Sequence, residues 1–198
     1  METSKISKTR TALIETARQL FVQNGKEHVT MNDIAVASGR GRRTLYLYFR
    51  NKNEIYLAAV ESELNLLVNR LNDVMMKNLP PEKKLEVYIF TRLEALKEVT
   101  LRNGLPRSDF LKDIYEVEKA RRPIDLKEIR MLKQILEAGK IAGIFKIESS
   151  QWTAMMILYA LKGFEGPYLN NAISAYIKEH RERIIHHLLY GLTSVYDD

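Results

Sequence analysis

Apolar residues recur at helical spacing along almost the whole chain, and the breaks between the runs fall at glycine or proline. The first run contains Leu13, Ala17 and Phe21 and ends at Asn24-Gly25, a pair that is typical of a helix C-terminus. No segment shows the strict alternation of apolar and polar residues that indicates a half-buried strand. The sequence therefore predicts an all-α fold.

The breaks divide the chain into about nine helices. Arg121-Arg122-Pro123 is expected to form a linker between two of them, and Gly166-Pro167 is expected to end another. The helix over 150–164 is apolar on nearly every side, which predicts burial on every side. The expected ranges are 7–24, 31–38, 42–49, 52–78, 82–101, 108–119, 123–142, 150–164 and 171–194.

The net positive charge of the chain lies entirely in its first quarter. Residues 1–53 contain ten Lys or Arg and four Asp or Glu, a net charge of +6, whereas residues 54–198 contain 21 of each and are formally neutral. This asymmetry indicates that the first quarter contacts a nucleic acid or an anionic membrane, the alternative being a solvated basic face. We expect two domains that meet at this boundary.

Composition excludes several classes of protein. The chain has no cysteine, which excludes disulfide scaffolds, Cys-ligated metal sites and thiol nucleophiles, and suits the cytoplasm. The first ten residues are polar, and the most apolar stretch is too short for a bilayer and carries Lys162, so we expect no signal peptide and no membrane segment. Only His180 and His187 share a helical face, and no zinc motif is present. We expect no metal, no cofactor and no catalytic site.

A helix-turn-helix is predicted between residues 31 and 49. Ala35 is small where a second helix crosses closely, Gly39 can take the positive φ that starts the turn, and Leu45 reaches the core shared with Ile34. Thr30 and Asp33 suit a capping box at the start of the first helix of the pair. The basic flanks strengthen the prediction of a DNA-binding module.

Residues 11–56 resemble the N-terminal DNA-binding domain of TetR-family transcriptional regulators. The resemblance implies a three-helix DNA-binding domain over 1–53, followed by a helical bundle over 54–198 that dimerises and binds a small effector. The chain departs from the family pattern at Arg40, Gly41 and Arg43, and Arg42 and Arg43 give the recognition helix more cationic reach than the pattern requires. The matching residues are Ile14, Ala17, Leu20, Phe21, Gly25, Thr30, Met31, Asp33, Ile34, Ala35, Gly39, Thr44, Leu45, Tyr46, Phe49, Lys52 and Ile55.

Nine residues are candidates for DNA contact. Arg42 and Arg43 suit guanine, which a guanidinium can bind bidentately, or else phosphate. Leu47 suits a thymine methyl, and Tyr48 is expected at the groove floor. The resemblance places Thr44 and Tyr46 at phosphate or base edges, although Tyr46 is also a candidate for the core. The remaining candidates are Thr30 and Lys52 for the DNA backbone, where Thr30 alternatively serves only as a helix cap, and Asn32 for a base edge, alternatively an exposed polar residue.

The second domain carries two sets of apolar candidates, each with ordinary core packing as the alternative. A dimer interface from the last two predicted helices contains Met155, Tyr159, Gly163, Ile173, Ile177, Ile184 and Leu188. An effector pocket contains Tyr88, Phe110, Tyr115, Met131, Trp152, Met156 and Tyr159. The neutral charge of this half favours an apolar or uncharged effector.

These features predict a homodimeric repressor that binds double-stranded DNA at a near-palindromic operator and is released by a small effector. The alternative is an architectural or division-related DNA-binding protein of the same fold that takes no effector.

Overall fold

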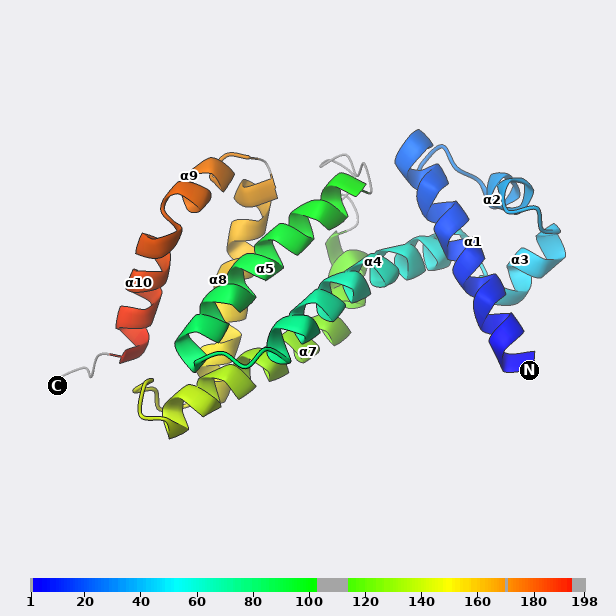
Figure 1. The fold of residues 1–198 in the computed structure, drawn as a ribbon. Coiled ribbons are helices and arrows are strands. Elements are labelled where there is room, and N and C mark those ends of the chain that lie inside the picture. Colours follow the sequence, from blue (N-terminus) through cyan, green and yellow to red (C-terminus); the bar gives the residue numbers. More distant parts are fainter. Residues whose placement is uncertain (1, 103–113, 170, 194–198) are drawn as a thin grey trace. The chain divides into compact units, whose positions relative to one another are not determined.

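The computed structural model describes residues 2–102, 114–169 and 171–193, and every regular element within these ranges is a helix (Figure 1). The all-α prediction is confirmed for this part of the chain. No helix in these ranges has the length and apolar character that a membrane crossing requires. The helices are α1 (Glu2–Asn24), α2 (Met31–Ala37), α3 (Arg42–Tyr48), α4 (Lys52–Met75), α5 (Pro81–Arg102), α7 (Ile114–Ile141), α8 (Ser150–Leu169), α9 (Ser174–Glu179) and α10 (Arg181–Thr193).

The chain divides into two compact units. The first unit takes in Met1–Asn65 and Val99–Arg122, and the second takes in Leu66–Glu98 and Pro123–Asp198. The predicted boundary after residue 53 falls just inside α4, which contributes to both units. The division into functional domains at that residue stays a prediction.

The turn between α2 and α3 depends on Gly39. This glycine has φ +61°, in the left-handed region that favours glycine, and open space surrounds the position of a Cβ. Its N–H donates to the carbonyl of Val36 at 3.1 Å, and the next N–H, of Arg40, donates to the carbonyl of Ala35 at 3.0 Å. These two bonds form a Schellman motif, so the conformation at Gly39 ends α2 and sets the direction of the chain into α3.

The helix α7 corrects the predicted linker at Arg121-Arg122-Pro123. The helix runs without interruption through Pro123, which lacks the N–H of a normal helical hydrogen bond. Residues 108–113 of the separate short helix expected before it lie outside the described residues. Arg121, Ile124 and Asp125 are all buried next to the proline, so side-chain packing on these turns compensates for the lost hydrogen bond.

Two further predicted ends are wrong. Helix α8 continues through Gly166-Pro167 to Leu169, because the flanking side chains of Glu165 and Tyr168 both face the interior of the second unit. The single helix expected over 171–194 is divided at His180 into α9 and α10.

Contacts at both ends fix α10 within the second unit. At its start, the guanidinium of Arg181 lies 4.1 Å from the ring centroid of Phe90 and 3.2 Å from a carboxylate oxygen of Glu86, both on α5. At its other end, the carbonyl of Leu192 accepts a 2.8 Å hydrogen bond from the N–H of Lys146, in the loop before α8. These local contacts account for the division at His180, because they place α10 independently of the direction of α9.

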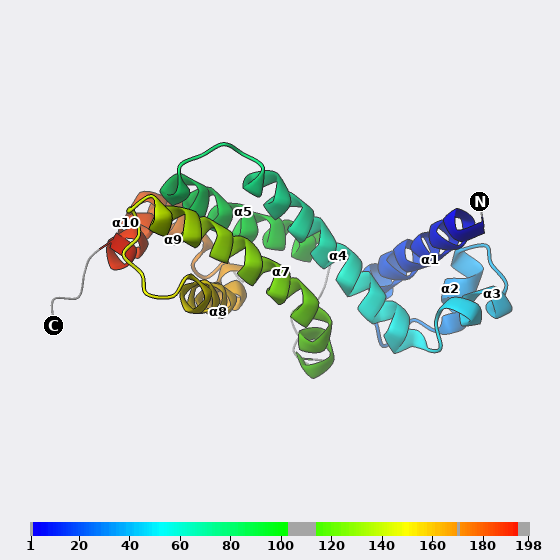
Figure 2. The same ribbon diagram turned by 90° about the horizontal axis from the view of Figure 1, so that it is seen from below.

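The prediction that α8 is buried on every side is also wrong for the single chain. Its inward face packs in the second unit, where α5, α7 and α8 lie side by side in both views (Figure 2). Its opposite face leaves Trp152, Met156 and Tyr159 more than half exposed. The inward face contains Ala154, Ile157, Leu158, Leu161, Glu165 and Tyr168.

A close contact within the second unit joins the end of α7 to the loop that follows it. Gly143 has φ +70° and reverses the chain, which brings the buried Phe145 ring against Gly139. A Cβ at residue 139 would lie 2.1 Å from Cδ2 of Phe145, far inside van der Waals contact. The contact therefore requires glycine at residue 139.

We expect Gly139→Ala to lower the free energy of unfolding by about 1–3 kcal/mol, because the new methyl overpacks the Phe145 ring. The matched control is Gly191→Ala in α10, where no atom lies within 4 Å of the new Cβ and alanine favours the helix by up to about 1 kcal/mol. Urea unfolding followed by circular dichroism measures both. Equal stability of the two variants would contradict the proposed packing.

Candidate nucleic-acid interface

Leu45 anchors α3 to the first unit. It is fully buried, as are Ile34 of α2 and Phe49 at the C-terminus of α3, whereas most of the other α3 side chains are exposed. Tyr46 is 46% exposed and Leu47 is 77% exposed. The short helix therefore presents an amphipathic surface whose outward side meets solvent.

The start of α2 is held by a reciprocal capping box between Thr30 and Asp33. The N–H of Asp33 donates to the Thr30 hydroxyl at 3.2 Å, and the N–H and hydroxyl of Thr30 each donate to Oδ2 of Asp33 at 2.8 Å. The backbone and hydroxyl hydrogen bonds from Thr30 lower the pKa of the Asp33 carboxyl. The predicted cap is confirmed, and both polar groups of Thr30 that were expected to meet phosphate are bonded to Asp33.

Three arginines lie together in sequence at the start of α3. Arg40, Arg42 and Arg43 are exposed, and none of them makes an ion pair within the described ranges. An exposed guanidinium without an internal partner is available to phosphate or to a guanine edge. Arg40 was not among the candidate contacts, although its place in a run of cations was visible in the sequence.

The ammonium group of Lys52 binds the turn between α1 and α2. Its Nζ donates to the carbonyl of Lys26 at 2.7 Å and to that of Glu27 at 3.2 Å. Asn51 caps α4 as predicted, since its Oδ1 accepts from the N–H of Glu54 at 2.9 Å. Lys52 therefore fixes the start of α4 within the first unit, and this role was not anticipated.

Aromatic and ionic contacts join α1 to α4 within the first unit. The rings of Phe21 and Tyr56 meet edge to face with centroids 5.5 Å apart, and the ammonium of Lys26 lies 4.2 Å from the Tyr56 centroid. Nε of Arg18 lies 3.4 Å from a carboxylate oxygen of the buried Glu63. The helices that support α3 are therefore held by several independent contacts.

Arg10 is a further exposed cation that the sequence argument did not single out. Its guanidinium carbon lies 5.2 Å from the ring centroid of Phe49, the residue that ends α3. This distance allows a cation–π contact, which places a positive charge of α1 beside the C-terminal end of α3.

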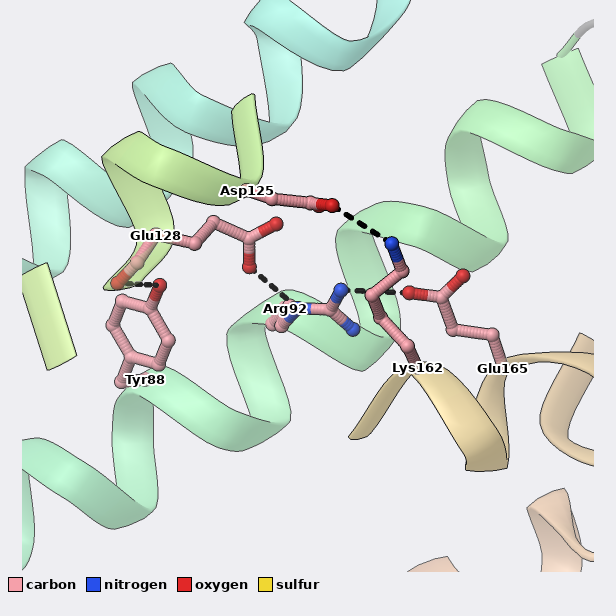
Figure 3. Close-up of polar contacts among 6 residues, drawn as sticks. All are labelled: Tyr88, Arg92, Asp125, Glu128, Lys162 and Glu165. Atoms are coloured by element: carbon pink, nitrogen blue, oxygen red, sulfur yellow. Dashed lines mark hydrogen bonds and ion pairs between the residues drawn. The ribbon is translucent and has the colours of Figure 1, made fainter. Parts of the chain in front are cut away.

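The second unit contains a buried set of charged residues, the interior polar cluster, in which α5, α7 and α8 meet (Figure 3). Arg92 of α5 is fully buried; its Nε lies 2.5 Å from Oε2 of Glu128, and its Nη2 lies 2.6 Å from Oε1 of Glu165. Lys162 and Asp125 form a second ion pair at 2.7 Å. One arginine therefore connects α5 to both α7 and α8.

Burial and charge determine the ionisation of this region. Burial opposes the charged form of Arg92, but the carboxylates of Glu128 and Glu165 outweigh it and raise the pKa of the guanidinium. Burial, together with the nearby Glu128 carboxylate, raises the pKa of Tyr88, whose hydroxyl lies 3.5 Å from the backbone carbonyl of Glu128. Both groups therefore keep their protons at neutral pH.

The predicted effector residues do not all lie in the interior. Tyr88 and Met131 are buried in the second unit, whereas Trp152, Met156 and Tyr159 are exposed on the outer face of α8. Phe110 lies outside the described residues, and Tyr115 lies in the first turn of α7. The effector pocket stays a prediction.

The predicted dimer residues differ in exposure. Tyr159 and Gly163 are exposed on α8, and Met155, Ile173, Ile184 and Leu188 are partly exposed. Ile177 is buried within the single chain. The dimer interface stays a prediction.

Residues 13–59 match the family model described as bacterial regulatory proteins, tetR family. The uncharacterized HTH-type transcriptional regulator YhgD of Bacillus subtilis (strain 168) is 23% identical over 146 residues, which cover 74% of this chain and 76% of the relative. The probable acrEF/envCD operon repressor of Escherichia coli (strain K12) is 45% identical over 49 residues, 25% of this chain and 22% of that repressor.

The fold is shared with the transcriptional regulator FadR from Bacillus subtilis, solved in complex with stearoyl-CoA. The TM-score is 0.67 at 19% identity, and the match covers 92% of this chain and 98% of FadR. At this identity the likeness establishes the fold alone.

We expect Arg92→Met to lower the free energy of unfolding by about 3–5 kcal/mol, because it leaves Glu128 and Glu165 buried without their shared cation. Arg70→Met is the control: Arg70 pairs with Glu98 at 2.5 Å, but both side chains are about half exposed, so its loss costs at most about 1 kcal/mol. Urea titration measures both. If the two variants lose the same stability, the cluster contributes no more than a surface ion pair.

Proposed function

This chain belongs to the TetR family of DNA-binding transcriptional regulators, and we propose that it is a homodimeric repressor released from a near-palindromic operator by a small effector. The observation that carries the proposal is the exposed, cationic surface of α3, which Leu45 and Gly39 hold in one orientation. An exposed helix of this kind suits the major groove, where base edges distinguish all four base pairs. The similarity over 49 residues to the probable acrEF/envCD operon repressor supports repression rather than activation.

The outer face of α8 supports the proposed dimer. Trp152, Met156, Tyr159 and Gly163 follow one another at intervals of four, three and four residues, and so form one stripe, the outer stripe, along the helix. Aromatic side chains and methionine are enriched at protein interfaces, and glycine allows close helix approach. We therefore propose that Trp152 and Met156, which were candidates for the effector pocket, lie in the dimer interface.

Two copies are needed for specificity on physical grounds. One α3 of seven residues reaches few base pairs, whereas a symmetric pair reads two half-sites and doubles the information in the operator. Dimer symmetry then accounts for a near-palindromic site.

The second unit supports an effector that is apolar or uncharged. Residues 54–198 are formally neutral, and FadR, which shares the fold, was solved with stearoyl-CoA, whose acyl chain is apolar and whose CoA part is anionic. Thermal-shift screening against apolar and uncharged metabolites tests this part of the proposal. No stabilisation by any compound, together with abundant genomic sites, would favour the effector-independent architectural alternative.

In vitro selection of bound DNA is expected to recover an inverted repeat. Arg42→Ala and Tyr46→Ala are each expected to weaken binding about tenfold, because each removes an exposed polar contact of α3. Each phosphate contact that is lost makes the slope of log affinity against log salt shallower by about 0.9. Arg130→Ala, an exposed cation of α7, is the control and should bind as the wild type does. Wild-type affinity and an unchanged salt slope in the double variant Arg42→Ala/Tyr46→Ala would contradict the role of α3.

Met156→Glu is expected to convert the dimer to a monomer, because it places a charge in the middle of the outer stripe. Met76→Glu is the matched control: Met76 is 86% exposed and lies outside the stripe, so this variant should remain dimeric. Sedimentation equilibrium measures the mass of each. A Met156→Glu variant that stays dimeric with the wild-type dissociation constant would refute the proposed interface.

A further inference from the structure

The orientation of α3 separates its side chains into an outward pair and two flanks. A helix turns about 100° per residue, so residues 43 and 47, each two positions from Leu45, lie about 160° from it. Residues 44 and 46 lie about 100° from Leu45, and residues 42 and 48 lie about 60° from it. Because Leu45 faces the interior of the first unit, Arg43 and Leu47 project farthest from that interior.

The exposure of the side chains agrees with this placement. Leu47 is 77% exposed, whereas Tyr46 is 46% exposed and Thr44 and Tyr48 are partly covered. Tyr48, which was expected at the groove floor, therefore lies on the side of the helix that turns back toward the unit.

We propose that Arg43 and Leu47 are the two residues of α3 that read base sequence, with Arg43 on a guanine and Leu47 on a thymine methyl. The proposal rests on the proposed function and specifies the sequence that the interface prefers. The two side chains lie about 40° apart around the helix axis, so they face the same groove.

The chemistry of each side chain selects its base. The guanidinium of Arg43 makes no ion pair within the described residues, and its paired N–H groups match the O6 and N7 acceptors that guanine presents in the major groove. Leu47 has no polar group, and the apolar feature of the major groove is the C5-methyl of thymine. An exposed leucine between arginines and tyrosines contributes nothing to the core of the unit, and a thymine methyl would cover it.

The spacing of the pair sets the spacing of the bases. Four residues of helix advance about 6 Å, and successive bases on one strand are about 3.4 Å apart. The guanine and the thymine are therefore expected within two base steps of each other in every half-site. Arg42 and Tyr46, which lie about 40° apart on one flank of the helix, are left to the phosphates on that side.

The test uses the 198-residue chain and the operator recovered by selection. One base of the operator at a time is replaced by an analogue that lacks a single contact group. Each thymine is replaced in turn by deoxyuridine, which lacks only the C5-methyl, and each guanine by 7-deazaguanine, which lacks the N7 acceptor. For the wild type, one thymine position in each half-site is expected to lose about fourfold in affinity, as for one buried methyl. One guanine position within two steps of it is expected to lose about tenfold.

Variants assign each effect to its residue. Leu47→Ala should bind the thymine and deoxyuridine operators equally, and Arg43→Ala should bind the guanine and 7-deazaguanine operators equally. Arg42→Ala is the matched control for Arg43→Ala; it should bind every operator more weakly while keeping both sensitivities. Far-UV circular dichroism checks that the variants are folded, as expected for exposed positions.

The outcomes separate this inference from the proposed function. If the wild type selects no sequence, both fail. If the wild type selects an inverted repeat but Leu47→Ala stays sensitive to deoxyuridine, the assignment of the pair is overturned. The same holds if Arg43→Ala stays sensitive to 7-deazaguanine. In both cases the proposed function as a DNA-binding regulator still stands. A sensitive guanine and thymine that lie more than two steps apart within a half-site would also overturn the assignment of the pair.

Discussion

The surface that α3 presents depends on the burial of one side chain, Leu45. A helix of seven residues has too few internal hydrogen bonds to be stable alone, so its position is determined by what it packs against. Leu45 supplies the packing, and the left-handed backbone at Gly39 supplies the direction of entry. Every exposed residue of the helix inherits its orientation from these two positions. The orientation of the cationic side chains on α3 therefore depends on this small apolar contact.

The second unit is organised by charge as well as by apolar packing. A fully buried arginine shared between two carboxylates is a costly way to join three helices, since apolar residues of similar volume often give equal or greater stability. The buried ion pairs instead fix the relative position of the three helices. Arg92 can pair with Glu128 and Glu165 together only when α5, α7 and α8 take one arrangement. The outer stripe belongs to the same α8 that carries Glu165, so the interior ions also fix the face of α8 that we propose as the dimer interface.

Local signals in the sequence predicted the first unit well and the second unit less well. The cap at Thr30, the turn at Gly39 and the inward Leu45 depend on residues close together in the chain, and each was predicted. The continuity of α7 through Pro123 and of α8 through Pro167 depends on packing, which outweighs a local proline signal. The Arg92 contacts join residues 36 and 73 positions apart, and nothing in a single sequence connects them. The glycine at 139 was visible, but its partner Phe145 meets it only after a reversal of the chain.

The two hydrogen bonds of Lys52 place little constraint on which amino acids occupy the turn between α1 and α2. Both acceptors are main-chain carbonyls, those of residues 26 and 27, rather than side chains. Every amino acid carries such a carbonyl, so substitution at either position leaves the acceptor in place provided that the turn keeps its shape. These two hydrogen bonds therefore require one particular side chain, Lys52, on α4 and no particular side chain on the turn. Substitutions at residues 26 and 27 can therefore leave the two Lys52 hydrogen bonds in place, although replacing Lys26 removes its contact with the Tyr56 ring.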